Sequence, residues 1–263
     1  MKQILYLMTL MISVVLISSC VPEDEDGEPD PDDVVTFADY NLERCVRDEM
    51  SEGSSGEVLY YKDVFWLSWL RCTGYGIEKL DGIENITNLR EAELGNNKIK
   101  DVTPLGKCVN LRDLDLSDNE ITDGSPLKNL ANITRLNIYD NSISDISYVK
   151  DMVNLNSLYT GGNPISDISP IANLANLESF SCADAKISEL PELSNLKNLE
   201  NFRVKENRII SIGSIKSLLN LKLIDVSENC ITDFSPIDYL MENGSLTSVQ
   251  GDSANDQDYD RCK

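Results

Sequence analysis

The chain has 263 residues, 41% of them hydrophobic, and its 45 acidic and 23 basic side chains give a formal net charge of −22. This acidic surplus argues against a nucleic-acid partner, because phosphate binding relies on lysine and arginine. The chain contains no histidine, which excludes Ser-His and Cys-His catalysis and zinc sites that need imidazole.

The amino terminus has the pattern of an export signal. Lys2 precedes an apolar run from Ile4 to Ile17, and its 14 residues are fewer than the roughly 20 that span a membrane. The run ends in Ile17-Ser18-Ser19-Cys20, which resembles the lipobox of bacterial lipoproteins. That resemblance implies a signal peptide over residues 1–19, cleavage before Cys20 and lipidation of this cysteine. An ordinary secretory signal with an incidental cysteine is the alternative.

Residues 20–36 are predicted to form a disordered tether behind the lipidated cysteine. Val21 to Thr36 holds eight acids, three prolines and no base, so it cannot bury apolar surface and its charges repel one another. Calcium binding is the alternative, but the run lacks the spaced glycine turn of a loop site. We expect the tether to hold the folded domain away from the membrane.

Residues 37–66 are interpreted as an amino-terminal cap. Apolar side chains of its first part lie at near-helical spacing: Phe37, Leu42, Cys45, Val46 and Met50. Gly53 and Gly56 then break the pattern. The spacing predicts a helix that covers the beginning of the following domain.

From Leu67 to Leu240 the sequence repeats with a fixed period of 22 residues. Each unit opens with leucine or isoleucine, at Leu67, Leu89, Leu111, Ile133, Leu155, Leu177, Leu199 and Leu221. Asparagine precedes seven successive openings, from Asn88 to Asn220. Such self-similarity is typical of solenoids, in which no unit buries its apolar face alone and stacked neighbours share one core. We therefore predict eight stacked units over residues 67–242.

Within each unit, apolar residues three and five positions after the opening one fit a short strand with both side chains on one face. An asparagine in the next turn is expected to point inward and bond backbone groups, at Asn97, Asn119, Asn141, Asn163, Asn207 and Asn229. Tyr75 and Ala185 replace this asparagine, and Thr160 occupies an apolar strand position. We expect local loosening there, with a water near Ala185.

The pattern L-x-x-L-x-L-x-x-N-x-I-x-D-I-x-P-L resembles the 22-residue leucine-rich repeats of internalins and related bacterial surface proteins, most closely between Asn110 and Pro126. The resemblance covers about two thirds of the chain. It implies an α/β solenoid, a right-handed superhelix with short parallel strands on the concave face and turns and 3-10 segments on the convex face. It also implies a helical amino-terminal cap, but it names no partner, because this fold serves many.

The chain has seven cysteines, and six remain in an oxidising compartment once Cys20 is assigned to the lipid. We predict a disulfide between Cys45 and Cys72, which joins the cap helix to the first repeat strand. A second, Cys230–Cys262, would fold residues 243–263 over the last unit as a carboxy-terminal cap. Related bacterial repeat proteins look similar at both ends. Cys108 and Cys182 lie more than three units apart and are expected to be buried free thiols, because disulfide geometry cannot span that distance.

Residues between the core positions of the strands are expected to face outward on the concave surface. In chain order that surface runs from acidic (Glu91, Glu93, Asp113, Asp115), through tyrosine, to basic. Aromatic and arginine side chains most often anchor protein interfaces, so the candidate contacts are Trp69, Arg135, Tyr139, Tyr159, Arg203 and Lys205. The alternative is a solvated face with incidental aromatics. The four carboxylates would bind a cation or a basic partner, or would simply be solvated.

These features predict a lipid-anchored, monomeric binding scaffold of the bacterial cell envelope, at the outer membrane and exposed on the surface. Its partner would be a protein or a glycan. A structural envelope protein without a specific ligand is the alternative. We expect no catalytic residues, no metal site and no cofactor, because short regular loops offer no deep pocket. An enzyme that uses a carboxylate pair is the third hypothesis.

Overall fold

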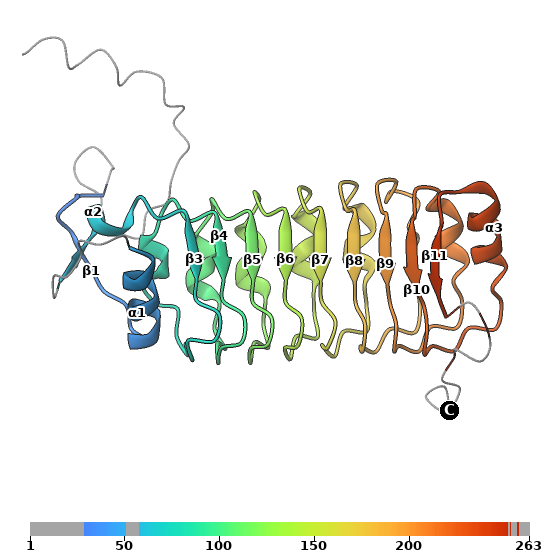
Figure 1. Ribbon diagram of the computed structural model, residues 1–263, viewed down its shortest axis with the longest axis horizontal. Helices are drawn as coiled ribbons and strands as arrows, with labels where there is room; N and C mark the ends of the chain where they lie inside the picture. The colour runs from blue at the N-terminus through green and yellow to red at the C-terminus, as the bar shows by residue number, and fades with distance from the viewer. Residues whose placement is uncertain (1–28, 51–57, 252, 254–256, 258–263) are drawn as a thin grey trace, which may run out of the picture.

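A computed structural model describes residues 29–50, 58–251, 253 and 257 of the chain. The repeats stack into an elongated solenoid (Figure 1) with one nine-stranded parallel sheet, in the order β11-β10-β9-β8-β7-β6-β5-β4-β3. The strands are β3 (Trp69–Arg71), β4 (Glu91–Glu93), β5 (Asp113–Asp115), β6 (Arg135–Asn137), β7 (Ser157–Tyr159), β8 (Ser179–Ser181), β9 (Asn201–Arg203), β10 (Leu223–Asp225) and β11 (Ser248–Gln250). Eight of them, β3 to β10, follow one another at the 22-residue period.

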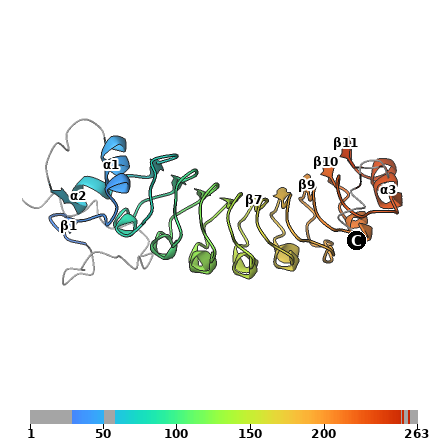
Figure 2. The same ribbon diagram turned by 90° about the horizontal axis from the view of Figure 1, so that it is seen from below.

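The sheet lines the concave side of the stack, and short helices line the convex side (Figure 2). These are the 3-10 helices η1 (Ile83–Asn85), η2 (Thr103–Lys107), η3 (Ser125–Asn129), η4 (Ser147–Asp151), η5 (Ser169–Asn173) and η6 (Gly213–Ser217), followed by α3 (Ser235–Asn243). An aspartate lies two residues before many of them: the Asp123 carboxylate, for example, accepts a hydrogen bond from the N–H of Ser125, the first residue of η3, at 2.8 Å. Among the described residues no helix has the length and apolar character needed to cross a membrane.

The apolar positions of all the units merge into one continuous core. Leu114 and Leu116 of β5 and its following turn are fully buried, and the same positions are buried in the neighbouring units. Because each strand is only three residues long, its stability comes from this shared packing between turns.

The inward asparagines form the predicted ladder between turns. Asn119 shows the pattern: its amide nitrogen donates to the carbonyls of Leu94, Leu116 and Ser117, and its oxygen accepts from the Ile99 N–H at 2.9 Å. The ladder prediction is confirmed. At Ala185, where the amide is missing, the Ile165 N–H donates instead to the Asn163 carbonyl at 2.8 Å. That donor therefore needs no water.

The amino-terminal part holds helix α1 (Tyr40–Glu49), helix α2 (Tyr61–Val64) and an antiparallel pair of strands, β1 (Val34–Val35) and β2 (Leu59–Tyr60). The chain is therefore ordered earlier than the predicted tether boundary at residue 36. The reason is local: Val35 is buried, so this valine supplies the apolar contact that the acidic run before it lacks. The predicted signal peptide and Cys20 lie outside the described residues.

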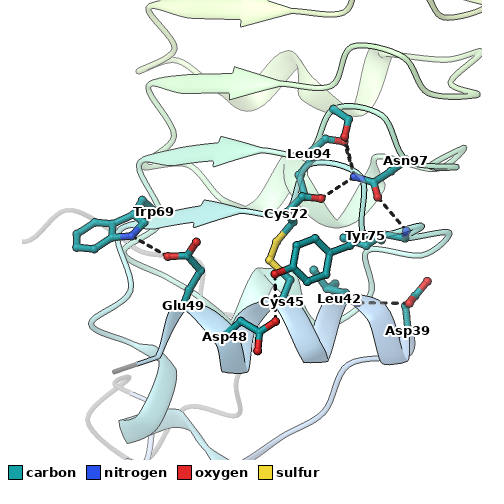
Figure 3. The surroundings of a disulfide bond; sticks show 12 residues. Asp39, Leu42, Cys45, Asp48, Glu49, Trp69, Cys72, Tyr75, Leu94 and Asn97 are labelled. Carbon is teal, nitrogen blue, oxygen red and sulfur yellow. Dashed lines mark hydrogen bonds between the residues drawn. A yellow bond between two sulfur atoms is a disulfide. The ribbon is translucent and has the colours of Figure 1, made fainter. Parts of the chain in front are cut away.

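Helix α1 lies against β3, with Leu42, Cys45 and Val46 on its buried face. A disulfide joins Cys45 to Cys72, just after β3, with the two Cα atoms 5.7 Å apart (Figure 3). This predicted bond is confirmed. Because the pairing links residues 27 apart in sequence, it fixes the helix to the first turn of the solenoid.

The carboxy-terminal end departs from the strict period. Strand β11 pairs in parallel with β10 and lies in the segment predicted as a cap, where Gln257 takes the role of the ladder asparagine. Its side-chain oxygen accepts from the Ile231 N–H at 3.3 Å, and its nitrogen donates to the Gly251 carbonyl at 3.0 Å. Cys230 is disulfide-bonded, but Cys262 lies outside the described residues, so their pairing stays a prediction.

Candidate binding surface

The outward residues of the strands form a regular grid on the concave face. Parallel register places Glu91 beside Asp113, Asp113 beside Arg135 and Arg135 beside Ser157. Neighbouring strands lie about 4.8 Å apart, so side chains from three successive units can contact one ligand. The face is thus a broad surface rather than an enclosed pocket.

Arg135 and Tyr159 are in contact near the middle of this face, and Tyr139 follows shortly after β6 beside Gly161 of the next unit; we call these three residues the central cluster. The Arg135 guanidinium lies 3.2 Å from a carboxylate oxygen of Asp113 on one side. On the other side its carbon is 5.7 Å from the centre of the Tyr159 ring. Arg135 is therefore held between an acid and an aromatic ring before any partner arrives, which lowers the entropy lost on binding.

Tyr139 follows β6 and keeps 42% of its surface exposed. A Cβ atom on Gly161 would lie only 3.2 Å from its Cδ2 atom, so the ring lies against the glycine backbone of the next unit. The negative charge of Asp140 and partial burial raise the pKa of the Tyr139 hydroxyl. The phenol stays neutral at neutral pH and can both donate and accept a hydrogen bond.

Small side chains continue the face beyond the central cluster. Ser157, Ser179, Ser181 and Ala183 are all partly exposed there, and the Asn201 amide donates to the Ser179 hydroxyl at 3.1 Å. The two tyrosines therefore stand beside residues of much smaller volume.

The acidic part of the face lies over β4 and β5. Glu91 and Glu93 are exposed, whereas Asp115 accepts hydrogen bonds from the Ser117 hydroxyl at 2.7 Å and the Asn137 amide at 3.1 Å. Within the part of the chain that the structure describes, no group of acidic or sulfur side chains is arranged to hold a metal ion. Contact with a basic partner stays a prediction.

The other predicted contacts do not join the central cluster. Trp69 lies three strands from Arg135, about 14 Å away, and its indole N–H donates to Glu49 of α1 at 3.0 Å (Figure 3). The Lys205 ammonium lies 2.9 Å from Glu206 and 3.1 Å from Glu228, and these hydrogen bonds raise its pKa. Because two acids surround Lys205, this end of the face is less basic than the sequence suggests, and the register places Arg203 of β9 beside Asp225 of β10.

One exposed feature was missed in the sequence. Phe65 and Trp66, in the turn before β3, keep 42% and 43% of their surface exposed. The signal was present as two adjacent aromatic residues just ahead of Leu67, but no local pattern tells which residues of a predicted cap stay exposed.

Comparison with known proteins finds repeats of the same kind. Residues 87–129, 109–150 and 131–173 match a family model described as "Leucine Rich repeats (2 copies)". The chain is similar to internalin InlF from Listeria monocytogenes, with 29% identity and a TM-score of 0.67 over 82% of this chain and 69% of that one. It is also similar to internalin C2 from that bacterium, with 29% identity and a TM-score of 0.74 over 81% and 93% of the two chains.

A more distant structure shares the fold alone. It is the plant peptide hormone receptor RGFR1 in complex with RGF2, with 24% identity and a TM-score of 0.57 over 64% of this chain and 28% of that one. No curated protein matches the chain.

Proposed function

Because the chain is an internalin-like leucine-rich-repeat protein, we propose that it is a binding scaffold whose concave strand face recognises a partner protein. The central cluster carries this proposal. Tyrosine and arginine are the residues that most often dominate binding energy at interfaces. Tyrosine beside serine and glycine, as at Tyr159, Ser157 and Gly161, is also the composition of antibody binding loops.

The scaffold is anchored to the cell envelope through a lipid on Cys20, at the outer membrane and exposed on the surface. The lipobox-like residues before Cys20 support this part of the proposal. Incorporation of labelled palmitate that persists in Cys20→Ser would contradict lipidation at this residue. Added protease that leaves the domain intact on whole cells would contradict its exposure on the surface.

Catalysis is not part of the proposed function. The buried Cys182 thiol has its pKa raised by burial to about 11, so it is protonated at neutral pH and is a poor nucleophile. The central cluster offers one guanidinium and two tyrosine rings, which suit recognition better than proton transfer.

Partner recovery by variants of the concave face tests the proposal. Tyr139→Ala/Tyr159→Ala should weaken partner binding by about tenfold or more, as expected when interface anchors are truncated. Tyr239→Ala is the matched control, because Tyr239 on α3 is also 42% exposed but lies away from the strand face. Equal recovery of the partner by the double variant, the control and the wild type would overturn binding through the concave face. A glycan that competes with recovery would instead assign the face to a sugar.

A further inference from the structure

Exposed apolar side chains gather at the amino-terminal end of the solenoid. Among the described residues, half of the large hydrophobic side chains that remain exposed lie between residues 34 and 69: Val34, Tyr40, Val58, Phe65, Trp66 and Trp69. The rest are scattered over the much longer stretch from Tyr139 to Met241. Both tryptophans of the chain belong to the first group. Large apolar residues that cluster on a surface mark a contact with another molecule or a membrane.

The turn after α2 forces two aromatic rings outward. Val64 and Leu67 on either side of the turn are buried in the core, so Phe65 and Trp66 between them project away from it. Asn88 holds the turn in place by donating its amide to the Phe65 carbonyl at 2.6 Å. The Tyr61 ring centre lies 5.8 Å from that of Phe65 and supports the ring from behind.

The neighbouring two-stranded sheet adds apolar surface. Val35 pairs with Leu59, and both are buried. Because side chains alternate across a strand, Val34 lies on the opposite, outer face, together with its partner Tyr60 and with Val58. We call Val34, Val58, Phe65 and Trp66 the aromatic end.

The chain enters the folded domain beside this aromatic end. The Tyr61 N–H donates to the Asp33 carbonyl at 2.8 Å, and the Lys62 N–H donates to the Pro31 carbonyl at 3.0 Å. The incoming segment is thus hydrogen-bonded to the first residues of α2, the short helix that ends just before Phe65. Pro29 lies nine positions after Cys20 in the sequence, so a fully extended chain between them spans about 30 Å at most.

We infer that the aromatic end rests in the headgroup layer of the membrane that holds the lipid anchor, in contrast to the expectation that the tether keeps the whole domain away from it. The inference depends on the proposed lipidation of Cys20. Tryptophan and other aromatic side chains favour this layer, because it is apolar on one side and wet on the other. The Lys62 ammonium of α2, next to the aromatic end, is already ion-paired with Asp32, so it offers little attraction to anionic lipids. The matching surface is therefore a zwitterionic lipid one.

Tryptophan fluorescence offers a direct test, since both emitters lie in this region. The lipidated full chain is reconstituted into phosphatidylcholine vesicles whose acyl chains carry bromine at a shallow or a deep position. Trp69→Phe leaves Trp66 as the sole emitter. Its emission should shift to the blue on reconstitution, and shallow bromine should quench it more strongly than deep bromine.

A matched reporter at another exposed apolar position controls for collisions with lipid. Trp66→Phe/Trp69→Phe/Ile210→Trp places the sole emitter at Ile210, which is 65% exposed and lies six units further along the solenoid; its emission should be neither shifted nor quenched. Equal quenching of the Trp66 and Ile210→Trp reporters would overturn the inference while leaving the anchor intact. A wild-type chain that does not float with the vesicles would overturn the anchor and the inference with it.

Discussion

A buried ladder asparagine acts as a hydrogen-bond junction between two turns of the chain. The Asn119 side chain is 9% exposed and satisfies three carbonyls and one N–H at once. A buried polar group left unpaired costs more than a single hydrogen bond contributes. The junction is therefore more sensitive to substitution than its size suggests.

Asn119→Ala should lower the free energy of unfolding by about 2–3 kcal/mol, because it leaves the Ile99 N–H and several carbonyls buried without this partner. Urea denaturation followed by circular dichroism measures the loss. Asn129→Ala, at an exposed position of η3, is the control and should change stability little. A loss at Asn119 no larger than that of the control would show that the ladder contributes little.

A row of turn residues on successive units has a left-handed backbone conformation. Asp140 has a φ of 49°, a conformation that asparagine and aspartate tolerate better than most residues. Burial raises the pKa of Asp140, and the charges of Asp118 and Asp184 raise it further. The folded state therefore binds this proton more tightly than the unfolded state, and stability falls as the pH rises through the shifted pKa.

Asp140→Asn should consequently stabilise the protein at pH 7, and the gain should disappear near pH 3, where the carboxyl is protonated in both states. Urea midpoints at the two pH values measure this difference. Asp151→Asn, which removes an exposed carboxylate at the end of η4, controls for the change in net charge. A gain at Asp140 that is the same at both pH values would contradict the assigned cause.

At the scale of elements, Asp39 connects helix α1 to the first turn of the solenoid. One carboxylate oxygen accepts from the Asn41 N–H at 2.7 Å and also from that of Leu42, and so caps the helix. The other accepts from the Glu78 and Lys79 N–H groups at 2.7 and 3.0 Å. Burial alone would raise the pKa of Asp39, but these backbone hydrogen bonds outweigh it and hold the pKa below its ordinary value.

Asp39→Ala should lower stability at pH 7 by about 1–2 kcal/mol, the usual cost of a lost helix cap. A lowered pKa means that the contribution is present above the ordinary carboxyl pKa of about 4 and is lost as the pH falls through the folded value. The difference from the wild type should therefore shrink in acid. Asp81→Ala, at an exposed position whose carbonyl accepts from the Ala38 N–H, is the comparison. An Asp39 effect that does not change with pH would contradict this account.

The elements that repeat and the cap helix α1 were predictable, whereas strands β1, β2 and β11 were not. Strands β3 to β10 and the asparagine ladder follow from a period that the core enforces in every turn. Strand β11 was not predicted, because Leu246 comes 25 residues after Leu221 instead of 22. Glutamine also replaces the ladder asparagine, at Gln257. Strand β1 was not predicted, because it forms by pairing with β2, and no local sequence pattern indicates that pairing.

On the concave face, the sequence predicts which side chains point outward but not which of them contact one another. The outward direction of Arg135, Tyr139 and Tyr159 follows from strand alternation. That Lys205 is surrounded by Glu206 and Glu228 depends on side-chain reach between turns. The change from acidic to basic along the face is therefore weaker than the residue types alone predict.

For the whole molecule, stability depends on the contacts between successive turns, and near Pro164 some of the recurring hydrogen bonds between turns are missing. In other units an N–H donates across to the isoleucine carbonyl of the preceding turn, as Glu120 does to Ile99 at 2.9 Å. Pro164 has no N–H to make this bond, and Ala185 lacks the ladder amide one turn further on. Two inter-turn hydrogen bonds are thus missing around one turn.

Hydrogen exchange should accordingly be faster at Ile165 and its neighbours than at the equivalent Ile121 turn, because local opening needs fewer broken bonds. Mass spectrometry of deuterated peptides compares the two regions within one molecule. Ala185→Asn should slow exchange at Ile165 by restoring a ladder acceptor. Equal protection of the two turns in the wild type would show that core packing compensates for the missing bonds.

The disulfide between Cys45 and Cys72 also sets how the domain responds to mechanical force. A pull on the chain from its amino-terminal side reaches the fold at β1, passes along α1 and crosses the disulfide directly into β3. The short β1–β2 pairing should peel away first, while residues 46–71 lie in the covalent loop and carry no tension. The solenoid and its concave face would therefore keep their shape under a load that has already straightened the segment before α1.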